Sequence, residues 1–458
     1  MRNILQPANR LPPEIISYIA RHVSRAGIDI RWVIPLTHVC RYWRESIISA
    51  PEHWTTISCY RKGQAILSLQ RSKSAPLQLI LDIGILRQDP EFRDLIMPHI
   101  QNTKTLQFDD FPTIEDFTQV VPNFPQSMPN LRSLGLERSS NEPDWDPPID
   151  PFKSFPHTLR SLLLSDIPLY PSFLKIRTLT KLSLRYYSIR APLGSIFDLL
   201  EKNRSLESVE LGIGSDGPPV LTSQRRVAIT SRLQHLLIDC CDAMTIRTLI
   251  SSIPLRRGAY LGIHLRSEHG LNDILSGISM THLANLPLPT SMEYHSACSR
   301  VVQLYGPNGT FSYYGGCTPA APFTEFPMLP LTNIRELRLV HSDPFVVFHP
   351  SSFPALETLS IGYHTDVSHL FFALFPNPSF FSSLKTLGFL DCVLTEEFME
   401  ELMWFAFSRK NTTSTWLHRV VIVHPEGNFP TADSISKLRN HVPVVDTRLG
   451  RRFPRDLT

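Results

Sequence analysis

Three stretches of the chain share one arrangement of leucines: LRSLGL at Leu131–Leu136, LRSLLL at Leu159–Leu164 and LTKLSL at Leu179–Leu184. In each stretch the first, fourth and sixth residues are leucine, and the others are mostly small or polar. Because successive side chains of a β-strand point to opposite faces, the fourth and sixth residues lie on one face of a short strand. A single strand cannot bury such a face by itself, so the arrangement predicts strands that stack on further copies.

The same arrangement recurs along most of the chain, and neighbouring copies start 20 to 33 residues apart except between Gly258 and Val301. The further copies are LESVEL from Leu206, LQHLLI from Leu233, IRELRL from Ile334, LETLSI from Leu356 and LKTLGF from Leu384, with weaker ones near Thr103, Gly258, Val301 and Leu417. This spacing is the unit length of leucine-rich repeats. The 39 prolines indicate that the returns between strands are irregular and only partly helical. We therefore expect residues 76–445 to form an α/β fold, a leucine-rich-repeat-like solenoid with short parallel strands.

Two cysteines follow the copies at a fixed distance. Cys241 and Cys392 each lie three residues after the last apolar strand residue, where such repeats favour Asn or Cys because the side chain bonds to the turning backbone. We expect both to be structural.

Residues 287–332 interrupt the repeats, with seven prolines and a Gly315-Gly316 pair. The run VVQLYGPNGTFSYYG predicts two short strands joined by a turn at Asn308-Gly309. The segment is either an insertion or a strongly divergent pair of repeats.

The N-terminal part, residues 11–54, has a helical period instead. Prolines that suit a first helical turn precede an apolar stripe through Ile15, Ile16, Ile19 and Val23. A second stripe contains Leu36, Val39, Cys40, Trp43 and Ile47. Two such helices can cover each other as a hairpin. A module of about 45 residues has only a marginal core, however. A module that is this small and this apolar is often stabilised by a partner surface.

These residues resemble an F-box. The matching stretches are LPPEIISYIARHV from Leu11, IPLTHVCRYWRESII from Ile34 and APEHW from Ala50, within residues 8–56. The stretch LSLQRSKSAPLQLIL, from Leu67 to Leu81, resembles the segment that leads into the repeats of many F-box proteins, and we expect residues 57–75 to form a linker helix. The resemblance implies a protein of the F-box and leucine-rich-repeat type, whose F-box inserts into a Skp-type adaptor and through it joins a cullin ligase scaffold. The implied adaptor-binding residues are Leu11, Pro12, Glu14, Ile15, Ile19, Pro35, Leu36, Val39, Cys40 and Trp43.

A protein substrate is then expected on the strand face, together with the interrupting segment. Residues between the strand leucines and just past the strands offer charged, aromatic and hydrogen-bonding groups for recognition. The expected substrate-binding residues are Lys181, Arg185, Tyr186, Glu336, Arg338, His341, Tyr363 and His364.

Composition narrows the remaining possibilities. The net charge is +3, without the basic stripe of a nucleic-acid binder, and we expect residues 446–458 to be a solvated basic tail. No run of about 20 apolar residues predicts a membrane span. Seven cysteines without a CxxC pair indicate a reducing compartment, the cytoplasm or nucleus, with neither disulfides nor a zinc site.

One pattern points toward a cofactor. Gly212, Gly214 and Gly217 have the spacing of a dinucleotide fingerprint, and Asp239 follows 22 residues later. Pro218-Pro219 come directly after, where a helix N-terminus would have to donate N–H groups to phosphate. We expect no cofactor, no metal and no catalysis. The leading hypothesis is a ligase adaptor, and the alternatives are a repeat scaffold without ligase function and, more distantly, a nucleotide-dependent enzyme.

Overall fold

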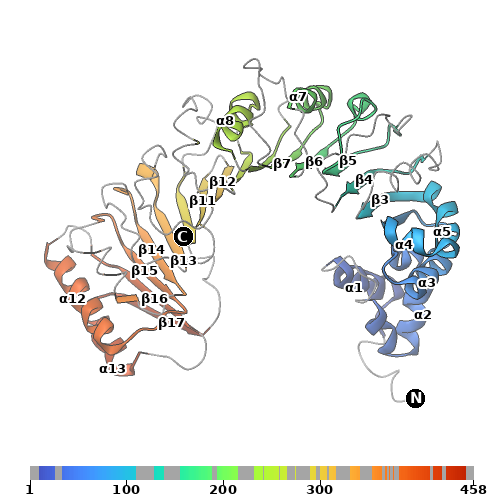
Figure 1. Cartoon of the computed structure of the whole chain (residues 1–458). Coiled ribbons are helices and arrows are strands. Elements are labelled where there is room, and N and C mark those ends of the chain that lie inside the picture. The colour runs from blue at the N-terminus through green and yellow to red at the C-terminus, as the bar shows by residue number, and fades with distance from the viewer. Residues whose placement is uncertain are drawn as a thin grey trace. The chain divides into compact units, whose positions relative to one another are not determined.

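The chain forms two compact units, Met1–Leu221 and Thr222–Thr458. Each is mixed α/β, with an open, mostly parallel sheet (Figure 1). The computed structural model describes residues 10–25, 33–109, 128–138, 155–187, 193–214, 232–240, 242–256, 258–265, 274, 289–295, 300–306, 309–315, 331–340, 353–363, 367–368, 371, 375, 381–412, 416–424 and 430–449.

The first unit begins with a helical module, residues Leu11–Trp54. Its elements are α1 (Pro13–Arg25), the 3₁₀ helix η4 (Ile34–His38), α2 (Arg41–Ser49) and the 3₁₀ helix η5 (Pro51–Trp54). They enclose a small apolar core whose buried members are Ile16, Ala20, Val33, Trp43, Ile47 and Trp54. The indole N–H of Trp54 donates to the carbonyl of Ile47 at 3.1 Å, so its one polar atom is satisfied inside that core.

A short mixed segment connects the module to the strands. It comprises β1 (Thr56–Ser58), α3 (Lys62–Ser72), β2 (Leu77–Asp82), α4 (Ile83–Gln88), α5 (Pro90–Ile96) and the 3₁₀ helix η6 (Met97–Asn102). The expected helix over residues 57–75 is present as α3 but is shorter, because residues 57 and 58 pair with β2 as part of β1. Asp82 and Asp89 accept backbone N–H groups of α4 and α5 and so fix where these helices begin.

Five further parallel strands follow in the first unit. They are β3 (Thr103–Asp109), β4 (Ser133–Glu137), β5 (Ser161–Ser165), β6 (Lys181–Tyr186) and β7 (Ser208–Ile213), each paired with the next along the chain. The leucines are in register: Leu136 lies beside Leu164, which lies beside Leu184. All three are fully buried, so the predicted strand positions and the buried face are confirmed.

Hydroxyl groups join each return to the preceding strand. A Thr or Ser three residues ahead of a strand donates to the carbonyl of the first leucine of the preceding copy, which lies two residues before the strand of that copy. These bonds run from Thr158 to Leu131 (2.8 Å), from Thr178 to Leu159 (2.6 Å) and from Ser205 to Leu179 (2.9 Å). Neighbouring copies are therefore held together at their starts as well as through their leucines.

Asn203 provides a further bridge, after α7 (Leu193–Lys202) and the 3₁₀ helix η8 (Phe173–Lys175). Its buried amide accepts from the N–H of Leu179 at 3.0 Å and donates to the carbonyls of Ile176 and Leu199, each at 2.9 Å. One side chain thus satisfies three backbone groups that belong to a helix, a return and a strand start.

The second unit has a longer sheet. Its parallel strands are β8 (His235–Cys240), β9 (Tyr260–Leu265), β13 (Glu336–Val340), β14 (Thr358–Gly362), β15 (Thr386–Leu390), β16 (Arg419–His424) and β17 (Val444–Leu449). The helices and 3₁₀ helix described in this unit are α8 (Ala243–Ser252), η10 (Leu331–Asn333), α12 (Glu396–Thr412) and α13 (Ala432–Arg439). Figure 1 shows α12 and α13 together along the strands from β14 to β17. The first residues of the expected basic tail are strand instead, because residues 446–449 continue the parallel pairing of β17 with β16. Asp446 there pairs with Arg419 at 3.1 Å and with Arg448 at 2.7 Å.

The segment that interrupts the repeats is built into this sheet. It supplies β10 (Ser291–His295), β11 (Arg300–Gly306) and β12 (Gly309–Gly315), and the predicted hairpin is confirmed as β11 and β12. β12 pairs with β9 and β10 pairs with β13, both parallel, whereas β11 is antiparallel to both of its neighbours. The weak copy near Val301 is therefore a strand, but it is wrong as a parallel repeat.

The cysteine after β15 has the expected role. Cys392 is buried, and its thiol contacts the carbonyls of Ile361 and Leu390 at 3.5 and 3.4 Å. Cys241 lies outside the described residues.

Candidate protein interfaces

The helical module has an apolar stripe on its outside. Pro12, Ile15 and Tyr18 follow one another at three-residue intervals around the first turns of α1, and all three are exposed. The side chain of Ile15 is 44% exposed although it is a large aliphatic residue. The ring of Tyr18 packs edge-on against His22 one turn further along, with ring centroids 4.4 Å apart.

The end of η4 and the first turn of α2 extend this stripe. Val39 is 53% exposed, and Tyr42 follows it by three residues and is also exposed. The Tyr42 hydroxyl donates to the carbonyl of Leu11 at 2.9 Å, which brings the first turn of α2 to the start of α1. We call Pro12, Ile15, Tyr18, Val39 and Tyr42 the adaptor face, after the partner that the F-box resemblance predicts.

The residues that the F-box resemblance assigns to adaptor binding divide into three groups. Those on the surface are Pro12, Glu14, Ile15, Pro35 and Val39. Leu11, Ile19, Leu36 and Cys40 are half-buried and pack against the module core. The prediction that Trp43 contacts the adaptor is corrected. Its side chain is buried in the core that includes Ile16 and Ile47, so it supports the module from inside and is not accessible to a partner.

Tyr18 and Tyr42 were not predicted as interface residues. Neither lies on the apolar stripe that predicts burial, and their position off the stripe is the sequence signal that could have indicated their exposure. A large aromatic side chain outside the buried stripe of a small helix is exposed unless another element covers it.

A polar network occupies another side of the module. The hydroxyl of Ser17 lies 2.8 Å from Nε2 of His53 and donates to Glu52 at 3.1 Å. Arg21 adds a loose ion pair with Glu52 at 3.9 Å. Burial lowers the pKa of the His53 imidazole. The network joins α1 to η5 and is a structural contact between them.

The first unit's sheet has an open face, formed by the residues that alternate with the strand leucines. On β6 these are Lys181, which is exposed, and Ser183 and Arg185, which are half-buried. The guanidinium of Arg185 pairs with Glu210 of β7 at 2.9 Å, and the hydroxyl of Ser183 donates to the same carboxylate at 3.1 Å. Lys181, Ser183 and Arg185 therefore lie on the same open face, as predicted.

Carboxylates gather on the same face over β3 and β4. The amide of Gln107 donates to Asp109 at 2.9 Å and to Glu137 at 3.0 Å, so one side chain holds both. Burial, followed by the nearby charge of Asp109, raises the pKa of Glu137. Carboxylates that sit so close favour a positively charged group on this part of the face.

Tyr186 does not lie on the open face. It is 1% exposed, and burial raises the pKa of its hydroxyl. The strand alternation continues through it, so it points inward like Leu182 and Leu184. The expectation that Tyr186 is accessible just past the strand is therefore wrong.

Gly212 and Gly214 of the fingerprint-like run make room for Tyr187, the residue that follows Tyr186 in the chain. A Cβ atom at Gly212 would lie 2.6 Å from the Tyr187 hydroxyl oxygen, and one at Gly214 would collide with the Tyr187 carbonyl. Both glycines are thus accounted for by packing. Gly217 lies outside the described residues.

The predicted substrate residues of the second unit are less accessible than expected. Glu336 is 7% exposed, which corrects its placement on the surface, and Arg338 forms an ion pair with it at 2.6 Å. Burial of this carboxylate requires such a partner. Tyr363 is half-buried and packs against a cluster of Leu390, Val421 and Val423. His341 and His364 lie outside the described residues.

The strands of the interrupting segment place aromatic groups beside those of β9. Tyr314 packs edge-on against His264, with ring centroids 4.3 Å apart, and accepts from Gln303 at 3.1 Å. Tyr305 donates to the same Gln303 side chain. Burial and then the charge of Glu293 raise the pKa of Tyr305 to about 12.

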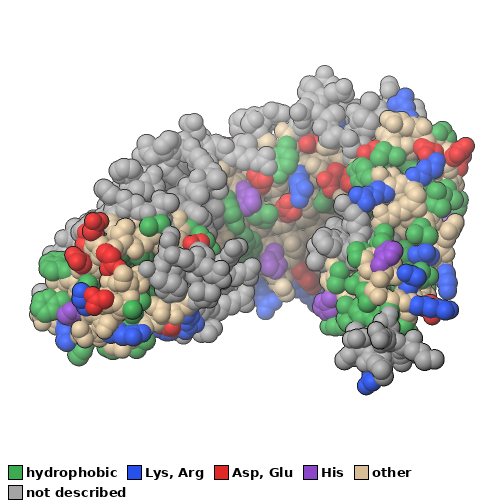
Figure 2. Space-filling model, turned by 90° about the horizontal axis from the view of Figure 1, so that it is seen from below, with side chains coloured by type: hydrophobic (Ala, Val, Ile, Leu, Met, Phe, Trp, Pro, Cys, Tyr) green, Lys and Arg blue, Asp and Glu red, His purple; other side chains and the backbone are tan. Residues whose placement is uncertain are grey.

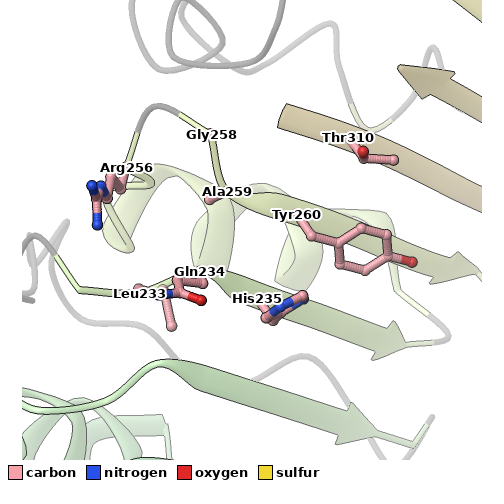
Figure 3. A pocket seen from close by; sticks show the side chains of 8 residues that line it. All are labelled: Leu233, Gln234, His235, Arg256, Gly258, Ala259, Tyr260 and Thr310. Atoms are coloured by element: carbon pink, nitrogen blue, oxygen red, sulfur yellow. The ribbon is translucent and has the colours of Figure 1, made fainter. Parts of the chain in front are cut away.

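A hollow of about 450 Å³ opens at the start of β8 and β9 (Figure 3). The rings of His235 and Tyr260 lie 5.8 Å apart at its edge. It is lined by Leu233, Gln234, His235, Arg256, Gly258, Ala259, Tyr260 and Thr310. The lining mixes polar and apolar groups and is open enough to take a side chain of a protein partner.

Within the described ranges, no three His, Cys, Asp or Glu side chains are grouped so that they could hold a metal ion. The same ranges contain no helix with the length and apolar character that a membrane span requires. No protein-family model and no curated protein matches the chain.

Proposed function

We propose that the chain is the substrate-recognition subunit of a Skp–cullin–F-box ubiquitin ligase, acting in the cytoplasm or nucleus. In this proposal the helical module binds a Skp-type adaptor, and the strands hold a protein substrate. The protein itself carries out no chemistry. The observation that supports the proposal most is the adaptor face, because it exposes several large apolar side chains on a module that resembles an F-box.

The adaptor face has the character of a docking surface. Ile15 and Val39 are aliphatic and exposed, and Tyr18 and Tyr42 combine a large apolar ring with a polar tip. Such groups dominate the energy of protein interfaces when a partner buries them. The half-buried Leu11 and Leu36 sit at its margin and tie the face to the module core.

The strand face has a different chemistry that suits a second partner. Lys181, Ser183 and Arg185 lie in one row on β6, with the carboxylate of Glu210 on the neighbouring β7 and that of Glu137 two strands away on β4. A face of interspersed charges and hydroxyls selects a partner by electrostatic complementarity more than by buried area. One chain would thereby hold two partners through surfaces that do not compete.

The first experiment tests the adaptor face. Purified full chain is titrated with a purified Skp-type adaptor in a calorimeter, and the same is done with an Ile15→Asp/Val39→Asp double variant. Both positions are exposed, so the variant should keep the melting temperature of the wild type while its affinity falls at least about 30-fold.

Leu95→Asp is the matched control, because Leu95 is an exposed aliphatic residue on α5 of the same unit. It should bind the adaptor like the wild type. A wild-type chain that does not associate at micromolar concentration, or a double variant that binds equally well, would rule out this proposal for the module. In the first case the repeat scaffold without ligase function becomes the better account.

The second experiment tests the strand face. A Lys181→Ala/Arg185→Ala variant should bind the adaptor normally yet lose the substrate, measured by proximity labelling in cells. Ser161→Ala, on the same face of β5, is the control and should label like the wild type. An unchanged labelling profile in the double variant would place the substrate elsewhere.

A further inference from the structure

Helix α12 has one face that is firmly seated in the second unit. Phe398, Met399, Leu402, Phe405 and Ala406 are all buried against the unit. Phe405 packs at 5.2 Å from Phe371 and at 4.6 Å from Phe375, measured between ring centroids. The helix is therefore held rigidly along most of its 17 residues.

Arg409 secures its C-terminal end. The side chain is fully buried and donates to the carbonyls of Phe381 and Leu384, each at 3.2 Å. Burial lowers the pKa of Arg409 to about 10. Because its guanidinium donates hydrogen bonds to backbone carbonyls inside the unit, Arg409 is not part of the outer surface of the helix.

The opposite face of α12 carries large aromatic residues in the open. Trp404 is 63% exposed and Phe407 is 50% exposed. They belong to a stripe at alternating intervals of three and four residues, which places its members on one side of the helix. The members, which we call the α12 seam, are Glu397, Glu400, Trp404, Phe407 and Asn411, and all are exposed. Figure 2 shows hydrophobic and acidic side chains exposed next to each other at the α12–α13 end of this unit.

The aromatic surface continues beside the C-terminal half of the seam. The ammonium of Lys410 lies 5.6 Å from the ring centroid of Trp416, an exposed residue that stacks on His418. His441 packs edge-on against Phe407 with centroids 5.7 Å apart. Exposed aromatic residues in such number mark an interaction site.

We propose that the α12 seam is a self-association surface, on which a second copy of this chain packs its own α12 antiparallel about a two-fold axis near Trp404. The seam spacing is that of helices that pack along their length, which favours a helical occupant. The proposal is independent of the adaptor function of the helical module.

The charges on the seam favour a second copy in this direction. Glu397 and Glu400 occupy the N-terminal half, and Lys410 flanks the C-terminal half. An antiparallel pair brings the acidic half of each helix to the Lys410 end of the other, whereas a parallel pair would set acidic halves against each other. Lys437 of α13 is paired with Asp433 at 2.6 Å and also interacts electrostatically with Glu400 of the same chain, so the arrangement relies on Lys410 and on Glu397 of the second copy.

The test begins with the mass of the full chain in solution. Sedimentation velocity between about 1 and 100 µM should show a monomer that becomes a dimer, since a single helix pair buries less than a standard interface of about 1,600 Å² and binds in the micromolar range. Trp404→Ala with Phe407→Ala should raise the dissociation constant at least about 30-fold. Met244→Ala is the matched control, because Met244 is equally open on α8 of the same unit, and it should dimerise normally.

A charge swap tests the direction of packing. Lys410→Glu and Glu397→Lys should each weaken the dimer by about 3- to 10-fold, since each places like charges in contact. The double variant Glu397→Lys/Lys410→Glu restores opposite charges in an antiparallel pair and should return to within about 3-fold of the wild type.

Four results would overturn the proposal. These are a monomer at every concentration, a dimer that ignores the Trp404 and Phe407 substitutions, a double swap no tighter than the single ones, and a monomer that sediments with phosphatidylserine vesicles through Trp404. The last result would assign the seam to a membrane surface instead. Because all of the changes are at exposed positions, unchanged melting temperatures verify that each variant is folded.

Discussion

The helical module and the parallel strands of the first unit use their apolar residues in opposite ways. On the strands, alternation gives Leu136, Leu164 and Leu184 buried positions in register and leaves charged and hydroxyl groups outside. The module is too small to cover all of its apolar residues, and Ile15 and Val39 stay in the open. Under the proposed function, an exposed aliphatic side chain marks the binding surface of the module, whereas on the strands the polar face is the binding surface.

The largest expected effect comes from breaking the buried side of the strands. Leu164→Asp places a carboxylate between Leu136 and Leu184 without a partner, which costs several kcal/mol and should prevent the unit from folding. Ser161→Asp adds the same group to the open face of the same strand and should change stability by less than about 0.5 kcal/mol. Urea denaturation followed by circular dichroism compares the two, and equal losses would mean that β5 is not buried on one side only.

The module offers the equivalent pair of substitutions. Trp43→Ala empties a buried position and should cost about 3–5 kcal/mol, whereas Val39→Ala removes an exposed side chain and should cost less than about 1 kcal/mol. Hydrogen exchange should show lost protection in α1 and α2 of the Trp43 variant. Retained protection there would contradict the assignment of Trp43 to the module core.

Asn203 tests how neighbouring copies are connected. Asn203→Ala removes a buried amide and leaves three backbone groups without their partner, so we expect a loss of about 2–4 kcal/mol. Asn203→Asp keeps the acceptor for the Leu179 N–H but loses both donors, and it should also destabilise the unit. If both variants melt like the wild type, the bridge between α7 and β6 contributes nothing to stability.

A smaller effect concerns pH. The pKa of His53 is lowered in the folded state by burial, so the unfolded chain binds a proton more readily. Stability is then complete above the ordinary histidine pKa of about 6.5 and declines as the pH falls below it. The melting temperature should fall between pH 7.5 and 5.5, and His53→Gln should flatten that slope. A slope that is the same in both proteins would assign the pH dependence to other groups.

The strand positions follow directly from the sequence, because the alternation of apolar and polar residues within a strand is a local pattern that predicts which side chains are buried. The copies beginning at Leu131, Leu159 and Leu179 became β4, β5 and β6, with their leucines inside. The pairing of the interrupting segment could not be predicted in the same way. Residues 300–315 predicted a hairpin, but which strands lie beside a hairpin depends on contacts between residues far apart in sequence.

The candidate interfaces were predictable in part. Ile15 and Val39 are exposed, as a partner surface requires, while Trp43, on the same apolar stripe as Val39, is buried. Helical periodicity shows which residues share a face but not how far the neighbouring helix covers them. Tyr186 and Glu336 illustrate the same limit on the strands. The alternation of β6 continues to its last residue and turns Tyr186 inward, and Glu336 is buried with an ion pair to Arg338.

Hydrogen exchange of the full chain with and without a purified Skp-type adaptor tests the central claim most directly. The account predicts that the adaptor slows exchange in peptides covering Leu11–Tyr18 and Leu36–Tyr42, and that β3 to β7 and the second unit exchange as before. The opposite result, slowed exchange on the strands with no change in the helical module, would contradict the division of the molecule into an adaptor-binding module and a substrate-binding sheet.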